Sequence, residues 1–104
     1  FDGSVRYKTS RAFTLPTNPG VYFIHDFRGI LYIGEAKNLR QRFLQHHRNE
    51  DNTKLRELVR YPFGELRFYW LDAHTKLKAV KIQKNWIRVF QPISNNIKYN
   101  KDRS

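Results

Sequence analysis

Residues 21–34 have the sequence VYFIHDFRGILYIG. The runs Val21–Ile24 and Ile30–Ile33 consist of β-branched and aromatic residues, which favour β-strands. The loop His25–Gly29 between them contains a glycine that can adopt a positive φ angle. Two such runs, separated by about five residues, predict an antiparallel hairpin.

The residues after the hairpin predict two helices, a strand and a longer helix. Asn38 is a good helix N-cap, and Thr53 could cap a second short helix. Glu65–Leu71 alternates in polarity and is rich in aromatic residues, so it predicts a strand. Lys76–Phe90 has helical periodicity and stops before Pro92. We therefore expect an α+β domain with a small three-stranded antiparallel sheet flanked by helices, in the order β-β-α-α-β-α.

The length of 104 residues allows one compact domain. We expect a basic lead-in segment at 1–15, the domain at 16–97 and a basic C-terminal tail at 98–104. The chain has no cysteine, which excludes disulfides and Cys-ligated zinc. It also has no methionine, which favours a piece of a longer protein with additional domains. Nothing resembles a signal peptide or a membrane span, so we expect no membrane partner and a cytoplasmic, nucleoid-associated location, or a nuclear one in a eukaryote.

Basic residues strongly outnumber acidic ones, and they lie in segments that are expected to fold. Lysine and arginine number 20 against 9 aspartate and glutamate, which gives a net charge of +11 and favours a polyanion such as nucleic acid. Lys76–Arg88 contains five basic residues and no acid, and Lys37–Arg60 contains seven basic residues and three acids. A basic face on an ordered scaffold can hold phosphates.

Polar residues with catalytic potential lie on the hairpin and on the helix after it. Tyr22 and Tyr32 are near the expected end of the sheet, where a suitable register can place both hydroxyls on one side. Asn38, Arg42 and His46 follow at i, i+4 and i+8 and form one polar line along a helix. Arginine presents a planar fork to phosphate oxygens, and histidine can transfer a proton near neutral pH.

A single polar residue interrupts the apolar stripe of the last helix. Gln83 shares the expected stripe of Val80, Ile87 and Phe90. Burying an unpaired amide costs a few kcal/mol, so Gln83 needs a partner. That partner is either the backbone or water at the edge of the stripe, or a functional site.

These segments together resemble the GIY-YIG nuclease family, from about Pro16 to Asn96. The resemblance rests on residues 18–22, NPGVY, with GVY in place of GIY, and on residues 31–43, LYIGEAKNLRQRF. Ile87, Pro92 and Asn95 after the last helix add to it. The family includes the incision domain of bacterial nucleotide-excision repair, phage homing endonucleases and some restriction enzymes.

The resemblance implies a role for each matching residue. Tyr22 and Tyr32 would line the active site and orient or deprotonate the attacking water, and which of them is the base stays open. Arg42 would neutralise the scissile phosphate. His46 matches a position that holds His or Tyr in relatives, and Asn95 matches an asparagine that supports the site.

The resemblance also implies a divalent metal, Mg²⁺ or Mn²⁺, and hydrolysis of DNA to 5′-phosphate and 3′-hydroxyl ends. Double-stranded DNA is the expected partner. Gln83 falls on the position of the family's metal-binding glutamate. The residues expected to contact nucleic acid are Lys37, Asn38, Arg40, Lys81 and Lys84.

The neutral amide of Gln83 predicts an endonuclease domain that has lost most turnover, with metal binding weakened or absent. The change is either an engineered Glu→Gln substitution or a natural one. The alternative is a non-cleaving, basic nucleic-acid-binding module derived from a nuclease. Glu35 is a second departure, because some relatives have lysine there.

Two other interpretations follow from the residues alone. Asp26 with Glu35-Ala36-Lys37 loosely matches an Asp…Glu-x-Lys metal site. Phe68, Tyr69 and Trp70 could stack on nucleic-acid bases, or they could be core residues of a strand.

Overall fold

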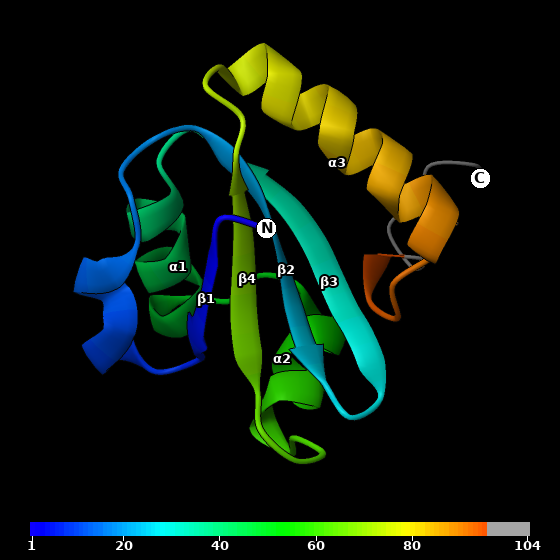
Figure 1. Cartoon of the computed structure of the whole chain (residues 1–104). Coiled ribbons are helices and arrows are strands. Elements are labelled where there is room, and N and C mark those ends of the chain that lie inside the picture. Colours follow the sequence, from blue (N-terminus) through cyan, green and yellow to red (C-terminus); the bar gives the residue numbers. More distant parts are fainter. Residues whose placement is uncertain (96–104) are drawn as a thin grey trace.

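The computed structural model describes residues 1–95 of the chain. The elements in chain order are β1 (Gly3–Arg6), the 3₁₀ helix η1 (Thr9–Thr14), β2 (Gly20–Asp26), β3 (Gly29–Ala36), α1 (Leu39–Arg48), α2 (Thr53–Arg60), β4 (Arg67–Asp72) and α3 (Lys76–Phe90) (Figure 1). The predicted tail at 98–104 lies outside the described residues.

The sheet has four antiparallel strands in the order β1-β4-β2-β3, so the expectation of three strands is wrong. The additional strand, β1, lies in the segment that was expected to be an irregular lead-in. β1 pairs with β4, from Gly3 opposite Trp70 to Arg6 opposite Arg67. A Cβ on Gly3 would lie 2.4 Å from the Trp70 ring, so the strand can approach β4 only with glycine there. Pairing with β4, rather than local propensity, forms this strand.

The predicted hairpin is confirmed, and its register decides which side chains share a face. Tyr22 lies opposite Gly34, and Ile24 lies opposite Tyr32. Because side chains alternate along a strand, Tyr22 and Tyr32 point to one face of the sheet. Val21 and Phe23 point to the other.

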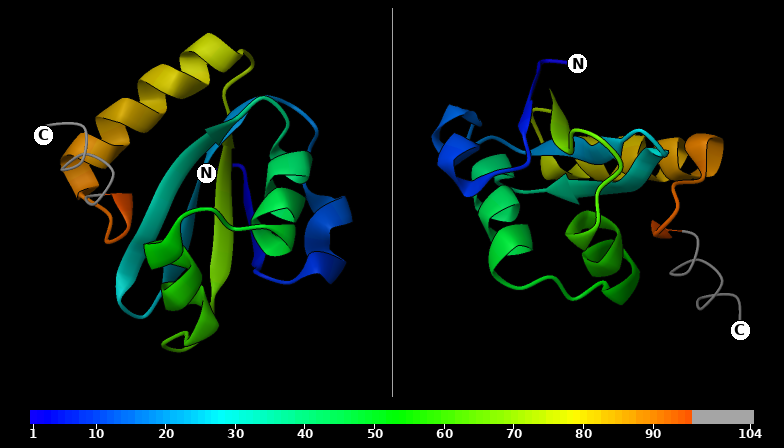
Figure 2. Two further views of the ribbon diagram at one scale, coloured as in Figure 1. Left: turned by 180° about the vertical axis from the view of Figure 1, so that it is seen from behind. Right: turned by 90° about the horizontal axis from the view of Figure 1, so that it is seen from below.

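Each face of the sheet has its own core. α1 and α2 cover the face of Tyr22, and α3 runs along β3 and packs on the opposite face (Figure 2). The first core contains Leu31, Leu39, Phe43, Leu55 and Phe68, and the second contains Val21, Phe23, Ile33, Ala79 and Ile87. Phe68 and Trp70 are therefore core residues and not an exposed stacking surface.

Side-chain caps begin all three α-helices. Asn38 Oδ1 accepts a hydrogen bond from the Gln41 N–H at 3.0 Å, as predicted for an N-cap. Asn52, rather than Thr53, caps α2 by accepting from the Leu55 N–H. None of the helices in residues 1–95 has the length and hydropathy that a bilayer-spanning segment requires.

The stripe of α3 differs from the expected one. Ala79 and Ile87 are buried on its inner face, with Ile82 and Trp86 packed partly against the same core. Phe90 is 55% exposed, because it lies at the end of the helix beyond the second core.

Residues 93–95 close the outer edge of β3. The Ser94 N–H donates to the Leu31 carbonyl at 2.9 Å, and the Ser94 hydroxyl donates to the same oxygen at 2.6 Å. Asn95 is buried and bonds both backbone groups of Ile33, accepting from its N–H at 2.7 Å and donating to its C=O at 3.0 Å. The side chain thus pairs with β3 as another strand would.

Candidate functional site

The site is built around Tyr22, whose side chain is fully buried. Its ring stacks on Phe68 with centroids 4.8 Å apart. Its hydroxyl lies directly beneath Gly34, where an added Cβ would be 2.3 Å from the hydroxyl oxygen. Gly34 does not have a positive φ angle, so glycine is needed here for space and not for backbone conformation.

Two side chains from α1 meet the Tyr22 hydroxyl. His46 Nε2 lies 2.5 Å from it, and Arg42 Nε donates to it at 3.3 Å. The Tyr32 ring completes the cluster, with its centroid 6.1 Å from that of Tyr22 and 5.7 Å from that of His46. The structure therefore brings together four of the residues that the sequence analysis singled out.

Glu50 is a member of this cluster that sequence reasoning missed. Its carboxylate bonds His46 Nδ1 and accepts a hydrogen bond from the Asn52 N–H at 3.1 Å. Because a carboxylate only accepts, Nδ1 of His46 carries a proton, and in the neutral ring Nε2 accepts the proton of Tyr22. The spacing of Glu50, four residues after His46, was the available signal, but Glu50 follows the end of α1.

The cluster keeps both phenols protonated and the guanidinium charged. Burial raises the pKa of Tyr22 well above its usual value, Tyr32 adds to that rise, and Arg42 opposes it. Burial likewise raises the pKa of Tyr32 against the opposing effect of Arg42. Tyr22 in turn raises the pKa of Arg42, so this side chain remains a cation.

Gln83 is not joined to this cluster by a hydrogen bond. It lies between Ala79 and Ile87 on the inner side of α3, and it is half-buried. Its side chain forms no hydrogen bond within residues 1–95, and α3 packs on the sheet face opposite Tyr22. The structure therefore leaves Gln83 on the far side of β3 from the buried hydroxyl.

Asn95 reaches the site through the backbone. Its two bonds hold Ile33, the residue between Tyr32 and Gly34. This geometry fits a residue that positions the hairpin.

The five residues expected to contact nucleic acid differ in exposure and in the hydrogen bonds that they already form. Lys37, Lys81 and Lys84 are exposed. Asn38 is occupied as the N-cap of α1. Arg40 donates to the carbonyls of Leu15 and Phe13, both at 3.0 Å, and so ties α1 to η1. Contact with nucleic acid stays a prediction for all five residues.

The alternative Asp26…Glu35 metal site is wrong. Asp26 pairs with Gly29 at the tip of the hairpin, while Glu35 pairs with Val21 near its other end. Asp26 is bonded by Arg28 and by the Phe63 N–H, and Glu35 forms an ion pair with Lys76. Within residues 1–95, no three His, Cys, Asp or Glu side chains gather as metal ligands would.

The chain is similar to known proteins over most of its length. The UvrC-like GIY-YIG domain family matches residues 18–100. UvrABC system protein C of Corynebacterium glutamicum is 34% identical over 93 residues, which cover 88% of this chain and 13% of that protein. The Streptomyces griseus protein of the same name is 33% identical over 91 residues, covering 86% of this chain and 12% of that protein. The chain therefore spans only about an eighth of the length of these relatives.

A solved structure shares the fold. It is the N-terminal GIY-YIG endonuclease domain of UvrC from Thermotoga maritima, bound to its catalytic magnesium. The TM-score is 0.67 with 21% sequence identity, over 82% of this chain and 91% of that domain. The family match covers most of the sequence, including both halves of the tyrosine hairpin, α1 and α3, and the chain belongs to the UvrC-like GIY-YIG domain family.

Proposed function

We propose that this domain binds DNA as part of a larger protein, and that it retains the residues for phosphodiester hydrolysis but lacks the metal-binding carboxylate that cutting requires. The observation that carries the proposal is a contrast. Tyr22, His46, Glu50 and Arg42 are assembled with direct hydrogen bonds, whereas Gln83, the position that the resemblance assigns to the metal-binding glutamate, carries a neutral amide.

Arg42 is the residue that would receive the scissile phosphate. It is half-buried on α1 beside both tyrosines, and its Nε donates to Tyr22. That bond orients the guanidinium, Nη1 also donates to Gln45 Oε1 at 3.3 Å, and the remaining N–H groups can contact phosphate oxygens. A fixed cation of this kind stabilises the charge that develops on a phosphate under attack.

Tyr22, His46 and Glu50 form a path for a proton. The Tyr22 phenol is too basic to ionise at neutral pH by itself, because burial raises its pKa. His46 accepts at Nε2, and the carboxylate of Glu50 stabilises the charge that His46 gains. Tyr22 can therefore pass its proton to His46, and on a water admitted to its buried hydroxyl this transfer would be general base catalysis through a phenol.

The donor set at position 83 does not fit a tightly bound divalent cation. The Thermotoga maritima domain holds magnesium, a hard ion that prefers anionic and water oxygens. Gln83 has only a neutral amide oxygen, and Glu35, the carboxylate on β3, is paired with Lys76. We therefore assign no step in this chain to a metal and propose that cutting is lost for this reason.

A non-cleaving binding module is the second candidate function, and the lack of a carboxylate at position 83 supports it as well. A basic domain with an intact GIY-YIG fold but without the metal carboxylate can serve as a binding module. The net charge of +11 favours this alternative as strongly as it favours the nuclease.

The Gln83→Glu substitution tests the proposal. The unchanged chain, Gln83→Glu and the matched charge control Gln41→Glu are incubated with supercoiled plasmid in Mg²⁺ or Mn²⁺. Gln41 is exposed on α1, so its substitution adds the same charge elsewhere. We expect Gln83→Glu alone to nick the plasmid, at least ~10³-fold faster than the unchanged chain, since a Lewis-acid metal supplies several kcal/mol.

A DNA ligase then tests the products, because it reseals only nicks with 5′-phosphate and 3′-hydroxyl ends. If all three proteins bind DNA and none cuts it, the binding module is the correct function. If the unchanged chain cuts as fast as Gln83→Glu, the proposed loss of activity is wrong.

A further inference from the structure

A second feature, away from Gln83, is a basic cleft between residues 6–8, the end of α1, α2 and the segment that leads into β4. It encloses about 930 Å³, within the range of ~300–1,000 Å³ that is typical of ligand pockets. Arg6, Tyr7 and Lys8 form one wall. These residues precede the family match, which begins at residue 18, so the cleft includes a part that is additional to the matched domain.

Most of the positive charge of the cleft is uncompensated. Its basic lining residues are Arg6, Lys8, Arg48, Arg56 and Arg60, against the acids Glu50 and Glu65. Both acids already have partners: Glu65 bonds Arg6 at 2.8 Å and Arg67 at 2.7 Å, and Glu50 bonds His46. Within residues 1–95, Lys8, Arg48 and Arg56 form no ion pair. Such a cleft attracts a polyanion.

Exposed aromatic rings lie at the α2–β4 end of the cleft. Tyr61 is 66% exposed and Phe63 is 57% exposed, and they flank Pro62, which lines the cleft. The Arg60 guanidinium lies over the Tyr61 ring at 5.7 Å.

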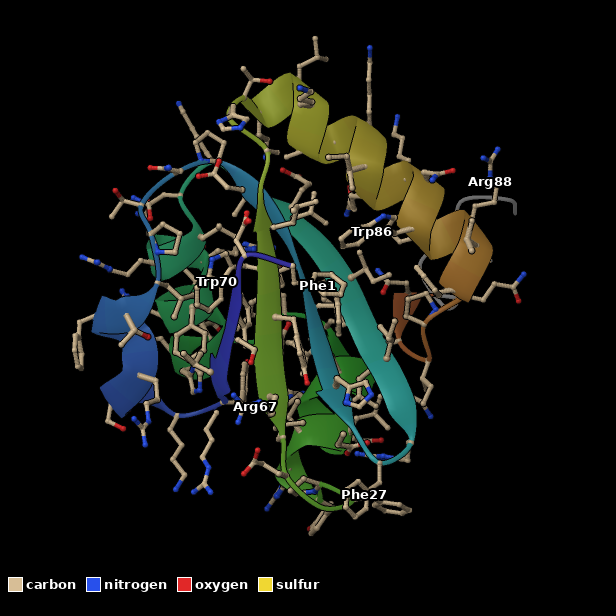
Figure 3. The ribbon with its side chains drawn as sticks, in the orientation of Figure 1. Phe1, Phe27, Arg67, Trp70, Trp86 and Arg88 are labelled. Atoms are coloured by element: carbon tan, nitrogen blue, oxygen red, sulfur yellow. The ribbon has the colours of Figure 1, made fainter. Side chains whose placement is uncertain are left out.

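Phe27, 84% exposed, lies beside them at the tip of the β2–β3 hairpin (Figure 3), and its N–H donates to the Phe63 carbonyl at 2.8 Å. Exposed rings that lie singly are common, but several that gather at one place mark an interaction surface. Duplex DNA keeps its bases stacked inside, so these rings can stack only on unpaired bases.

The cleft also reaches the candidate active site. His46 lines the cleft and bonds the Tyr22 hydroxyl, and Glu50 lines it as well. His47 is another lining residue, and its buried Nε2 has no hydrogen-bond partner within residues 1–95. A polyanion in the cleft would therefore lie next to the residues proposed to handle the proton.

We propose that the basic cleft and the rings of Tyr61, Phe63 and Phe27 bind single-stranded DNA. The phosphates lie along Lys8, Arg48 and Arg56, and unpaired bases stack on the exposed rings. The combination of uncompensated cations with solvent-exposed aromatic rings is what single-strand binding surfaces use. This inference rests on the proposed binding of DNA, but not on whether the Gln83→Glu variant cuts.

Fluorescence anisotropy with the full chain tests the inference. The probe is a labelled oligothymidylate of about 16 nucleotides, the upper end of the site sizes of small single-strand binding folds, and the comparison is a blunt hairpin duplex of equal nucleotide number. We expect the oligothymidylate to bind at least about fivefold more tightly than the hairpin, since stacking on a ring contributes that much per base.

Two variants and two matched controls locate the site. Arg56→Ala should lower the slope of log affinity against log salt by about 0.7, the value for one single-strand phosphate contact. Lys54→Ala, on the same helix but outside the cleft, should leave that slope unchanged. Tyr61→Ala should weaken binding by about fivefold or more, whereas Phe13→Ala removes a ring that is 74% exposed on η1 and should have no effect.

Circular dichroism melts of all four variants check that each is folded; the altered side chains are exposed, so none is expected to unfold. Equal affinity for hairpin and oligothymidylate would overturn the inference. Equal losses in Tyr61→Ala and Phe13→Ala, or in Arg56→Ala and Lys54→Ala, would do the same, since the binding would then lie elsewhere. Stronger binding of oligouridylate than of oligothymidylate would assign the cleft to RNA instead of DNA.

Discussion

Replacing Asn95 with alanine should loosen the strand that carries Tyr32 and Gly34. The Asn95 side chain is buried and bonds both the N–H and the C=O of Ile33, at 2.7 and 3.0 Å. Alanine can replace neither bond. Both backbone groups of Ile33 would then lose their partners at the outer edge of β3.

The expected loss of stability follows from the unpaired N–H and C=O groups of Ile33. A buried donor or acceptor left without a partner costs about 1–3 kcal/mol, and water can reach an edge strand more easily than the core, so the low half of this range applies. We expect the free energy of unfolding to fall by about 2–4 kcal/mol for the pair. For a domain of this size the melting temperature falls by roughly 4–8 °C per kcal/mol, which gives a decrease of roughly 8–32 °C.

Urea unfolding followed by circular dichroism measures this loss, and Ser94→Ala is the control. Ser94 loses only its hydroxyl bond to the Leu31 carbonyl, because its N–H still donates to the same oxygen. That variant should lose about 1 kcal/mol. A loss below about 0.5 kcal/mol in Asn95→Ala would refute the claim that this side chain closes the sheet edge.

The remaining predictions concern a site residue and a buried carboxylate. Arg42→Ala, placed in the Gln83→Glu background, should slow plasmid nicking by about 10²–10³-fold while urea unfolding changes little; undiminished cutting would remove Arg42 from the mechanism. Burial alone raises the pKa of Asp26, but hydrogen bonds from Arg28 and Phe63 outweigh it, so the pKa lies below 3.8. The stabilisation is present above pH 4 and is lost as the pH falls through the lowered pKa, so Asp26→Asn should flatten the loss of stability between about pH 4 and 2; parallel curves would contradict this.

Local patterns predict the parts of the site that lie within single elements. The hairpin register places Tyr22 and Tyr32 on one face, and the i, i+4 spacing on α1 places Arg42 and His46 together. Both follow from periods of two and 3.6 residues that can be counted along the sequence.

Tertiary contacts determine the parts that sequence reasoning missed. β1 has no strong strand signal and forms because β4 offers a free edge. Glu50 lies beyond the end of α1, and only the fold shows that its carboxylate turns back to His46. Helical periodicity places Phe90 on the apolar stripe of α3, but it does not show where the sheet beneath the helix ends, and Phe90 is exposed.

The close approach of the Tyr22 hydroxyl to Gly34 links the two halves of the hairpin motif sterically. A methyl group at position 34 would occupy the place of the phenol oxygen, although the backbone there would accept any residue. Positions 22 and 34 are therefore expected to change together. A descendant chain that acquires a side chain at 34 should also have a shorter side chain at 22 in place of the phenol, and would then lack the proposed proton path to His46.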